Sequence, residues 1–303
     1  MKQTKETNKA KKSLLPLNTK EKAKKKIQVV EVTLPSVITN PTASTLKPFK
    51  EAAKRNQKLL AAKIKKEKEH TTFLAKPLAK GKFYKLDLRL RSPEALSVQT
   101  MNAVEAAPAL VRLAKVKGLN AIAVTDYYDW SQIELTRKAA LGTPVTIIPG
   151  LCVNCKVTND SIITNIILFP ETYSISQIEA CTNELQIPQN IRGRSDYVLK
   201  QEYGTLLNIV EKHGGIVIPT RVDLTPHHLL SIPKLIEEYG IHCFDLAHPD
   251  NHDFFKQRWP KGQFTFFSFS NASSLAQIGS RMTKIKMLKS GFEGIKEIVK
   301  RRK

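Results

Sequence analysis

The sequence contains little that would mark a secreted or membrane-spanning protein. Its 303 residues include only 4 Cys, too few for a disulfide scaffold in a chain of this length, so we expect an intracellular, reducing compartment such as the cytoplasm or nucleoid. No apolar run approaches the roughly 18 residues that a membrane-spanning helix requires. The Lys-rich start also lacks the apolar stretch of a secretory signal. We therefore expect no membrane partner.

Signatures of common catalytic sites are missing as well. The sequence has no glycine-rich phosphate loop of the Walker or dinucleotide type and no Gly-x-Ser-x-Gly motif. Cys152 and Cys155 form a Cys-x-x-Cys pair without the second pair of a zinc site, so both are interpreted as small buried side chains. One acidic and histidine-rich cluster has generic spacing and is interpreted as surface or loop-capping residues, with a metal site as the alternative: His248, Asp250, His252 and Asp253.

Positive charge is abundant, and it is unevenly distributed. The chain holds 49 Lys and Arg against 27 Asp and Glu, a net charge of +22. Residues 1–80 contain 21 basic and 6 acidic residues, residues 81–280 contain 19 of each, and residues 281–303 contain 9 and 2. A neutral body therefore carries a basic extension at each end.

Residues 1–80 are predicted to be a basic extension that is largely disordered or helical. Residues 33–47 are rich in Thr, Pro and Ser and are typical of a linker, whereas 48–70 are rich in good helix formers. Clusters of this kind attract phosphates, so the predicted partner is DNA, RNA or a nucleoprotein complex, with a merely solvated arm as the alternative. The candidate contacts are Lys22, Lys24, Lys25, Lys26, Lys54, Arg55, Lys58, Lys63, Lys65 and Lys66.

Residues 81–303 alternate between short strand patterns and helix patterns. Residues 83–90 alternate apolar and polar side chains, and 121–124 is a short apolar run typical of a buried parallel strand. Similar strand patterns recur from 145–148 to 283–287. A helix is predicted over 108–117, and a basic helix near 292–299 is packed by Phe292, Ile295 and Val299. This alternation indicates an α/β fold with a mostly parallel sheet, and about seven strands favour a barrel.

Five phrases in this region resemble, in order, the motifs of PHP (polymerase and histidinol phosphatase) domains. Segment 83–92 is similar to a strand that ends in His-x-His-Ser, and 118–127 to one that ends in Thr-Asp-His. Segments 149–153, 214–223 and 270–279 are similar to Pro-Gly-x-Glu-Val, Gly-Gly-x-x-Ile-Pro-Ala-His-x-Asp and Ser-Asp-Ala-His-Ser-Leu. The resemblance is to bacterial stand-alone metal-dependent phosphoesterases. It implies a distorted seven-stranded TIM-like barrel with a metal site at the carboxyl ends of the strands.

The sequence departs from the family at every metal-ligand position that can be placed. The positions of the family's histidines and carboxylates fall on Arg89, Arg91, Tyr127, Cys152, Thr164, Arg221, Asn271 and Ser273. An arginine cannot be deprotonated and offers no lone pair to a metal. The resemblance therefore implies a degenerate member of the family, with no metal and no cofactor.

The three arginines at these positions are candidates for binding an anion. Arg89 and Arg91 lie two residues apart on a strand and therefore on one side, which the resemblance places at the barrel mouth with Arg221. Nearby acids could neutralise them as an internal ion-pair plug: Asp87, Asp126 and Asp223. The alternative is capture of a phosphate group, whose oxygens suit the guanidinium fork.

The predicted function is a catalytically inactive PHP-like protein that binds nucleic acid or serves as a structural subunit of a nucleoprotein assembly. Two alternatives remain: a metal-dependent phosphoesterase with a remodelled metal site, and a sensor of an anionic metabolite. Metal content separates the first two readings, and removal of the basic extension separates the first from the last.

Overall fold

A computed structural model describes residues 81–96, 102–159 and 161–301. The predicted linker at 33–47, the predicted helix at 48–70 and the ten candidate nucleic-acid contacts all lie outside these residues. Within the described ranges, no helix combines the length and the apolar character needed to cross a bilayer.

Strands and helices alternate along most of the described chain. The strands are β1 (Lys82–Leu90), β2 (Ala121–Val124), β3 (Thr146–Thr158), β4 (Ser161–Leu168), β5 (Ile216–Thr220), β6 (Cys243–Asp245), β7 (Thr265–Phe267) and β8 (Thr283–Met287). The helices are α2 (Pro93–Leu96), α3 (Ala103–Val116), α4 (Ile133–Ala140), α5 (Ile175–Glu184), α6 (Tyr203–Lys212), α7 (Pro226–Leu229), α8 (Ile232–Glu237), α9 (His252–Arg258) and α10 (Gly291–Val299).

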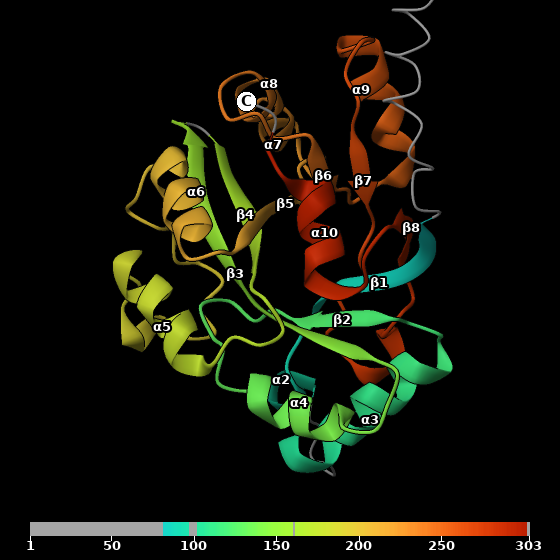
Figure 1. The fold of residues 1–303 in the computed structure, drawn as a ribbon. Coiled ribbons are helices and arrows are strands. Elements are labelled where there is room, and N and C mark those ends of the chain that lie inside the picture. The colour runs from blue at the N-terminus through green and yellow to red at the C-terminus, as the bar shows by residue number, and fades with distance from the viewer. Residues whose placement is uncertain (1–80, 97–101, 160, 302–303) are drawn as a thin grey trace, which may run out of the picture. The chain divides into compact units, whose positions relative to one another are not determined.

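The strands form one curved sheet in the order β7-β6-β5-β4-β3-β2-β1-β8. Strands β1, β2, β3, β5, β6 and β7 run in one direction, and β4 and β8 run against them. The sheet is a nearly closed TIM-like α/β barrel, which confirms the predicted fold class (Figure 1). It has eight strands, one more than the resemblance implies. Its two ends face each other across β7 and β8, where the Ser268 amide donates to Thr283 Oγ1 at 2.8 Å.

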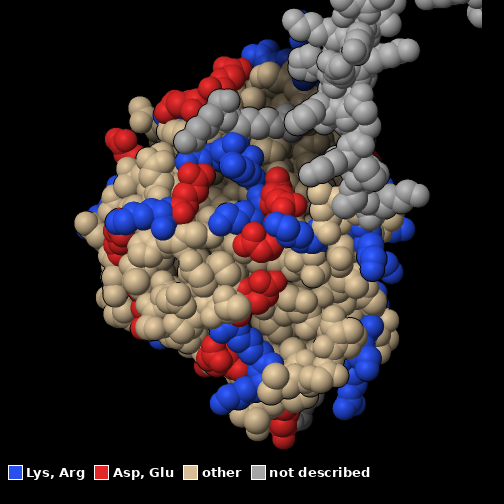
Figure 2. Space-filling model, viewed as in Figure 1, with Lys and Arg blue, Asp and Glu red and all other residues tan. Residues whose placement is uncertain are grey.

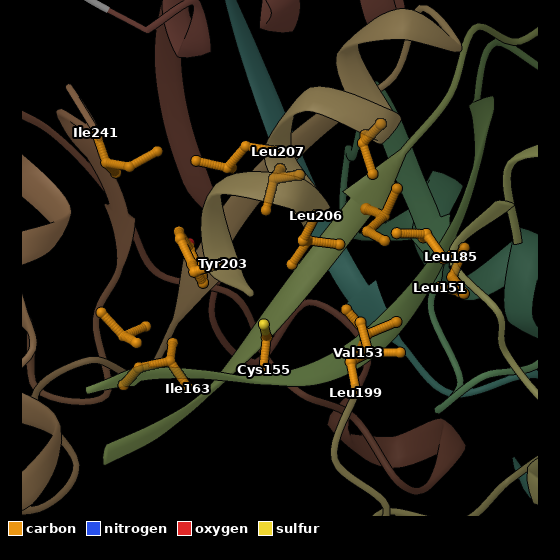
Figure 3. Packing of buried hydrophobic residues seen from close by; sticks show 14 of the residues in the cluster. Leu151, Val153, Cys155, Ile163, Leu185, Leu199, Tyr203, Leu206, Leu207 and Ile241 are labelled. Carbon is orange, nitrogen blue, oxygen red and sulfur yellow. The ribbon is translucent and has the colours of Figure 1, made fainter. Parts of the chain in front are cut away.

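Three apolar clusters hold the barrel together. One lies between β3, β4 and the helices α5 and α6 and includes Val153, Cys155 and Leu206 (Figure 3). A second contains side chains from all eight strands, from Leu86 on β1 to Met287 on β8, together with α10. A third joins β1, β2 and β3 to α3. Every parallel strand is thus fixed in position, which in turn fixes the loops that follow the strands.

Two elements extend further than the sequence patterns predict. Helix α3 begins at Ala103, before the predicted start at 108, because Asn102 and Glu105 form a capping box in which each side chain accepts the other residue's amide. Strand β3 continues from the predicted end at 148 to Thr158 because β4 pairs with it as an antiparallel hairpin. Cys152 and Cys155 therefore lie within a strand, and both are buried free thiols.

Helix α10 closes the rim of the barrel at the amino-terminal ends of the parallel strands. Phe292, Ile295 and Val299 are buried, as the sequence predicts. The Glu171 carboxylate, just after the reversed strand β4, accepts the Phe292 amide at 2.6 Å. At the other end of α10, the Ile298 carbonyl accepts from His242 Nε2 at 2.9 Å, just before β6. The opposite rim, where six strands end, stays available for a site.

Candidate functional site

The carboxyl-terminal ends of the parallel strands collect the charged residues that the sequence singles out. Arg89 lies near the end of β1, Asp126 follows β2, and Arg221 follows β5. Asp245 is the last residue of β6. In α/β barrels this rim is where functional sites are built, because its loops can vary while the strands stay fixed.

Arg89 forms a buried ion pair with Asp245. Arg89 Nη1 lies 3.8 Å from Asp245 Oδ2, and the two side chains are only 6% and 2% exposed. Burial raises the pKa of Asp245 to about 7, while the Arg89 charge acts in the opposite direction. The other carboxylate oxygen accepts the Phe269 amide at 3.0 Å. Among the described residues, Nε and Nη1 of Arg89 have no hydrogen-bond partner, so its charge is balanced mainly by this one carboxylate.

Arg91 pairs with Asp126 nearer the surface. Arg91 Nη1 lies 3.6 Å from Asp126 Oδ1, and the guanidinium carbon lies 4.8 Å from the centroid of the Tyr127 ring. The Ser92 amide lies 3.2 Å from Asp126 Oδ2 and holds this carboxylate in place. Burial raises the pKa of Asp126, with Ser92 and Arg91 opposing the rise. The pairing of an arginine with Asp126 is one of the contacts the ion-pair interpretation requires.

Arg221 sits in a strained backbone conformation at the same rim. Its φ is 50°, and Tyr128 and Asn271, after β2 and β7, have φ of 53° and 51°. Non-glycine residues in this left-handed region each store about 1–2 kcal/mol. The Arg221 amide donates to the Asp245 carbonyl at 2.6 Å, which fixes the strained turn against β6. In the described part of the chain, Arg221 Nε is buried without a hydrogen-bond partner.

Asp87 and Asp223 are engaged by loops rather than by arginines. Asp87 accepts the Ser270 amide at 3.1 Å and the Gly279 amide at 3.2 Å, and burial raises its pKa to about 6. Asp223 accepts the backbone amides of Ala247 and His248 at 2.6 and 2.8 Å, and the Asn251 side chain at 2.9 Å. These carboxylates hold the loops after β6 and β7 in shape.

The other positions that the resemblance aligns with metal ligands form neutral polar contacts. The Tyr127 hydroxyl lies 3.5 Å from Thr164 Oγ1, which donates to Asn154 Oδ1 at 2.7 Å. Cys152 is buried on β3, and burial raises the pKa of its thiol. The Ser273 amide donates to Gln277 Oε1 at 2.9 Å.

No cluster of at least three His, Cys, Asp or Glu side chains suited to holding a metal occurs within residues 81–96, 102–159 and 161–301. In the acidic and histidine-rich cluster at 248–253, His252 Nδ1 lies 3.0 Å from the Pro249 carbonyl, and His252 Nε2 lies 3.2 Å from Asp253 Oδ1. Asp253 is exposed, and His252 is partly exposed. This contact pattern is that of a short helix on the surface.

A cavity of about 440 Å³ opens beside the Arg91–Asp126 pair. Arg192, on the loop between α5 and α6, contributes a second guanidinium, which lies 4.7 Å from the Trp130 ring centroid. Arg89 and Arg221 do not line this cavity. Its polar lining consists of Arg91, Ser92, Glu94, Asp126, Asp129, Arg192, Ser195 and Ser273.

Sequence reasoning identified the rim but missed several of its residues. Asp245 and Arg89 are 156 positions apart, and no local pattern links them. Arg281, which donates to the Leu246 carbonyl at 2.8 Å and to Ser268 Oγ, lies in the basic final segment and was grouped with it. The left-handed φ angles of Tyr128 and Arg221 have no sequence signal, because neither residue is a glycine or an asparagine.

Comparison with known proteins shows similarity in fold. The chain is similar to the lesion-specific endonuclease EndoQ of Pyrococcus furiosus, at 20% identity and a TM-score of 0.51 over 72% of this chain and 56% of that protein. PsfC of Pseudomonas syringae gives 12% identity and a TM-score of 0.45 over 73% of this chain and 89% of PsfC. An amidohydrolase of Chromobacterium violaceum gives 10% identity and a TM-score of 0.48 over 71% of this chain and 97% of the amidohydrolase.

The chain thus spans just over half of the endonuclease to which it is similar. No protein-family model matches the sequence, and no curated protein matches it. The shared feature is a TIM-like barrel fold.

Proposed function

We propose that this protein is a PHP-like barrel that has lost its metal centre and that binds nucleic acid without hydrolysing it. One observation carries the first half of the proposal. At the strand ends where the resemblance places metal ligands, Arg89 and Arg91 stand paired with Asp245 and Asp126. A guanidinium repels a divalent cation and cannot coordinate it, so in this proposal the buried Arg89–Asp245 pair and the half-buried Arg91–Asp126 pair take the place of the metals.

The nucleic-acid partner is supported by charge and by fold. Residues 1–80 carry 21 of the 49 basic residues and only 6 acidic ones, and such segments bind phosphates with release of counterions. A nuclease that acts on damaged sites shares the barrel, which makes nucleic acid the first partner to test. The basic extension supplies the attraction in this proposal, and the barrel supplies a rigid body.

The cavity at the rim supports a second candidate, a sensor of a phosphate-containing ligand. Arg91 and Arg192 are each held against an aromatic ring while lining the same space. Of the three arginines proposed from the sequence, only Arg91 reaches this cavity. The third candidate, a phosphoesterase with a remodelled metal site, has less support, because no group of three or more His, Cys, Asp or Glu side chains suited to a metal occurs among the described residues.

The test combines metal content, hydrolysis and binding in one preparation of the full chain. We expect less than about one transition metal per chain after incubation with manganese or zinc, and no hydrolysis of a generic phosphodiester. A fluorescent oligonucleotide should bind, and its affinity should fall as the salt concentration rises. In a plot of log affinity against log salt, each phosphate contact should contribute about 0.7–0.9 to the steepness of the slope.

Two results would overturn the proposal. Stoichiometric tightly bound metal, with an activity that a chelator abolishes, would mean that the barrel is an enzyme. Absence of oligonucleotide binding at low salt, together with stabilisation by inorganic phosphate that Arg91→Gln removes, would favour the anion sensor. The matched control is Arg137→Gln, which removes one arginine from a helix outside the cavity.

A further inference from the structure

An exposed aromatic side chain lies among lysines on the outer face of the β1–β8 ribbon. Phe83 is directly opposite Lys286, and Lys85 is directly opposite Lys284. Since side chains on one strand alternate between faces and directly opposite residues share a face, all four point to the same side. The intervening residues Tyr84 and Ile285 point inward and pack on the barrel core.

This part of the barrel wall has no helix over it among the described elements. Helix α3 covers the other half of β1, where Leu90 packs with Leu110 and Ala114. The first residues of β1 are therefore exposed while its last five are buried. Phe83 is 62% exposed, and Leu288, just beyond β8 on the same face, is 57% exposed. The Phe83 ring is therefore open to contact by a binding partner.

The charge around Phe83 is of one sign. Lys85, Lys284 and Lys286 are exposed, and no carboxylate of the described chain forms a salt bridge with any of them. The Lys284 ammonium lies 5.0 Å from the Phe83 ring centroid. The Lys85 ammonium lies beside Gly118, at the end of α3. Figure 2 shows Lys and Arg side chains gathered along its right edge, over β1 and the end of α3.

Resting on the proposed function, we propose that this ribbon face, defined by Phe83, Lys85, Lys284 and Lys286, binds unpaired nucleotides by stacking a base on Phe83. Single-stranded nucleic acid is bound by aromatic rings on which bases stack, with cations placed to meet the phosphates on either side. The ribbon face offers both within two adjacent strands. Duplex hides the faces of its bases, so the Phe83 ring selects single strands.

The basic extension and the ribbon face would then have separate tasks. The lysines of the extension would attract any nucleic acid by charge alone. A ring fixed on a sheet selects for bases that are free to stack. The pairing of Phe83 with Lys286 fixes both at a set spacing, which gives the barrel a means of recognition independent of its altered rim.

The test uses the full chain and fluorescein-labelled oligouridine, oligothymidine and a duplex of equal length. Phe83→Leu should weaken binding of both single strands about tenfold, because one stacked base is lost, and leave the duplex unchanged. Phe83→Trp should retain single-strand binding. Lys284→Gln with Lys286→Gln should reduce the single-strand salt slope by about 1.4, two phosphate contacts. The control variant Lys138→Gln with Lys200→Gln removes the same amount of charge from other places on the surface. It should leave the salt slope of single-strand binding unchanged.

On irradiation, an oligonucleotide that contains bromouridine should become cross-linked to Phe83, and peptide mapping can identify the cross-linked residue. The uridine and thymidine arms distinguish RNA from DNA as the preferred strand. If Phe83→Leu binds single strands as tightly as the parent and no cross-link forms at Phe83, the ribbon face is not the binding site. The proposed function would still hold, because the protein would still bind nucleic acid.

If Phe83→Leu weakens duplex binding as much as single-strand binding, stacking on Phe83 is excluded. If the parent binds no nucleic acid, both proposals fail. Altered self-association of Phe83→Leu without altered binding would reassign the face to a second copy of the chain.

Discussion

At the scale of single residues, the barrel mouth shows how opposite charges can be buried together. An isolated charge buried at Arg89 would be strongly destabilising, and so would one at Asp245. Together, 3.8 Å apart, they largely compensate each other, although such a pair adds little net stability over apolar residues. The ion pairs therefore balance two of the arginines at the rim, Arg89 and Arg91.

The pH dependence of stability should report on Asp245. Its pKa in the folded state is about 7, above the roughly 3.9 of an unfolded chain. The folded protein consequently binds more protons between these values, and stability should fall as pH rises from about 4 to 7. Denaturant unfolding of the parent and of Asp245→Asn across this range should show a difference that changes by at most about 1.4 kcal/mol per pH unit. If the free energies of unfolding of the parent and of Asp245→Asn run parallel across this pH range, the raised pKa of Asp245 is wrong. Asp87, with a pKa of about 6, adds a slope of the same sign to both proteins.

Backbone strain at Arg221 gives a second prediction at this scale. Glycine adopts a φ of 50° without the steric cost that alanine meets. Arg221→Gly should therefore be more stable than Arg221→Ala by about 1 kcal/mol, although both lose the guanidinium that acts on Asp245. Because Arg221 does not line the cavity, phosphate should not alter this difference. Equal stability of the two variants would show that the turn relaxes.

At the scale of elements, the sequence was informative wherever a pattern was local. The apolar run at 121–124 and the alternation at 83–90 gave β2 and β1 nearly to the residue. It was less informative where a distant partner decides the structure. The extension of β3 depends on pairing with β4, and the partner of Arg89 is set by how β1 and β6 curve around the barrel. Asp87 and Asp223 were proposed as partners of arginine because the resemblance places them near the rim, and the amides that hold them belong to loops with no sequence pattern.

Helix α10 illustrates how a local pattern and its packing agree. Phe292 is fully buried in the core cluster that joins the strands. Phe292→Ala should cost about 3–5 kcal/mol in the free energy of unfolding, because it removes a large side chain and leaves a cavity. Lys300→Gln, an exposed residue just after the helix, should cost almost nothing. A small loss for Phe292→Ala, measured by denaturant unfolding, would mean that α10 does not close the barrel.

At the scale of the whole molecule, the division of charge implies a division of labour. Residues 81–280 hold 19 basic and 19 acidic residues, so long-range attraction to phosphate must come from the two ends of the chain. At the rim, Arg89 and Arg91 form ion pairs. On the ribbon face, Lys85 of the body and Lys284 and Lys286 of the basic final segment form no salt bridge with a described carboxylate. Long-range capture and local recognition can therefore be separated by experiment.

Deleting residues 1–80 performs that separation, since it removes a net charge of +15 out of +22. The barrel should remain folded, because its first strand begins at Lys82, and circular dichroism can verify this. Oligonucleotide affinity at low salt should fall by orders of magnitude and the salt slope should flatten by several contacts, each worth about 0.7–0.9. The matched control replaces Lys22, Lys24, Lys25 and Lys26 by Gln in the full chain, which should produce a smaller change of the same kind. Whatever binding survives the deletion should prefer single strands over duplex and should disappear when Phe83→Leu is added. Unchanged affinity and slope after the deletion would show that the extension is not a binding element, and the barrel surface would then account for the whole interaction.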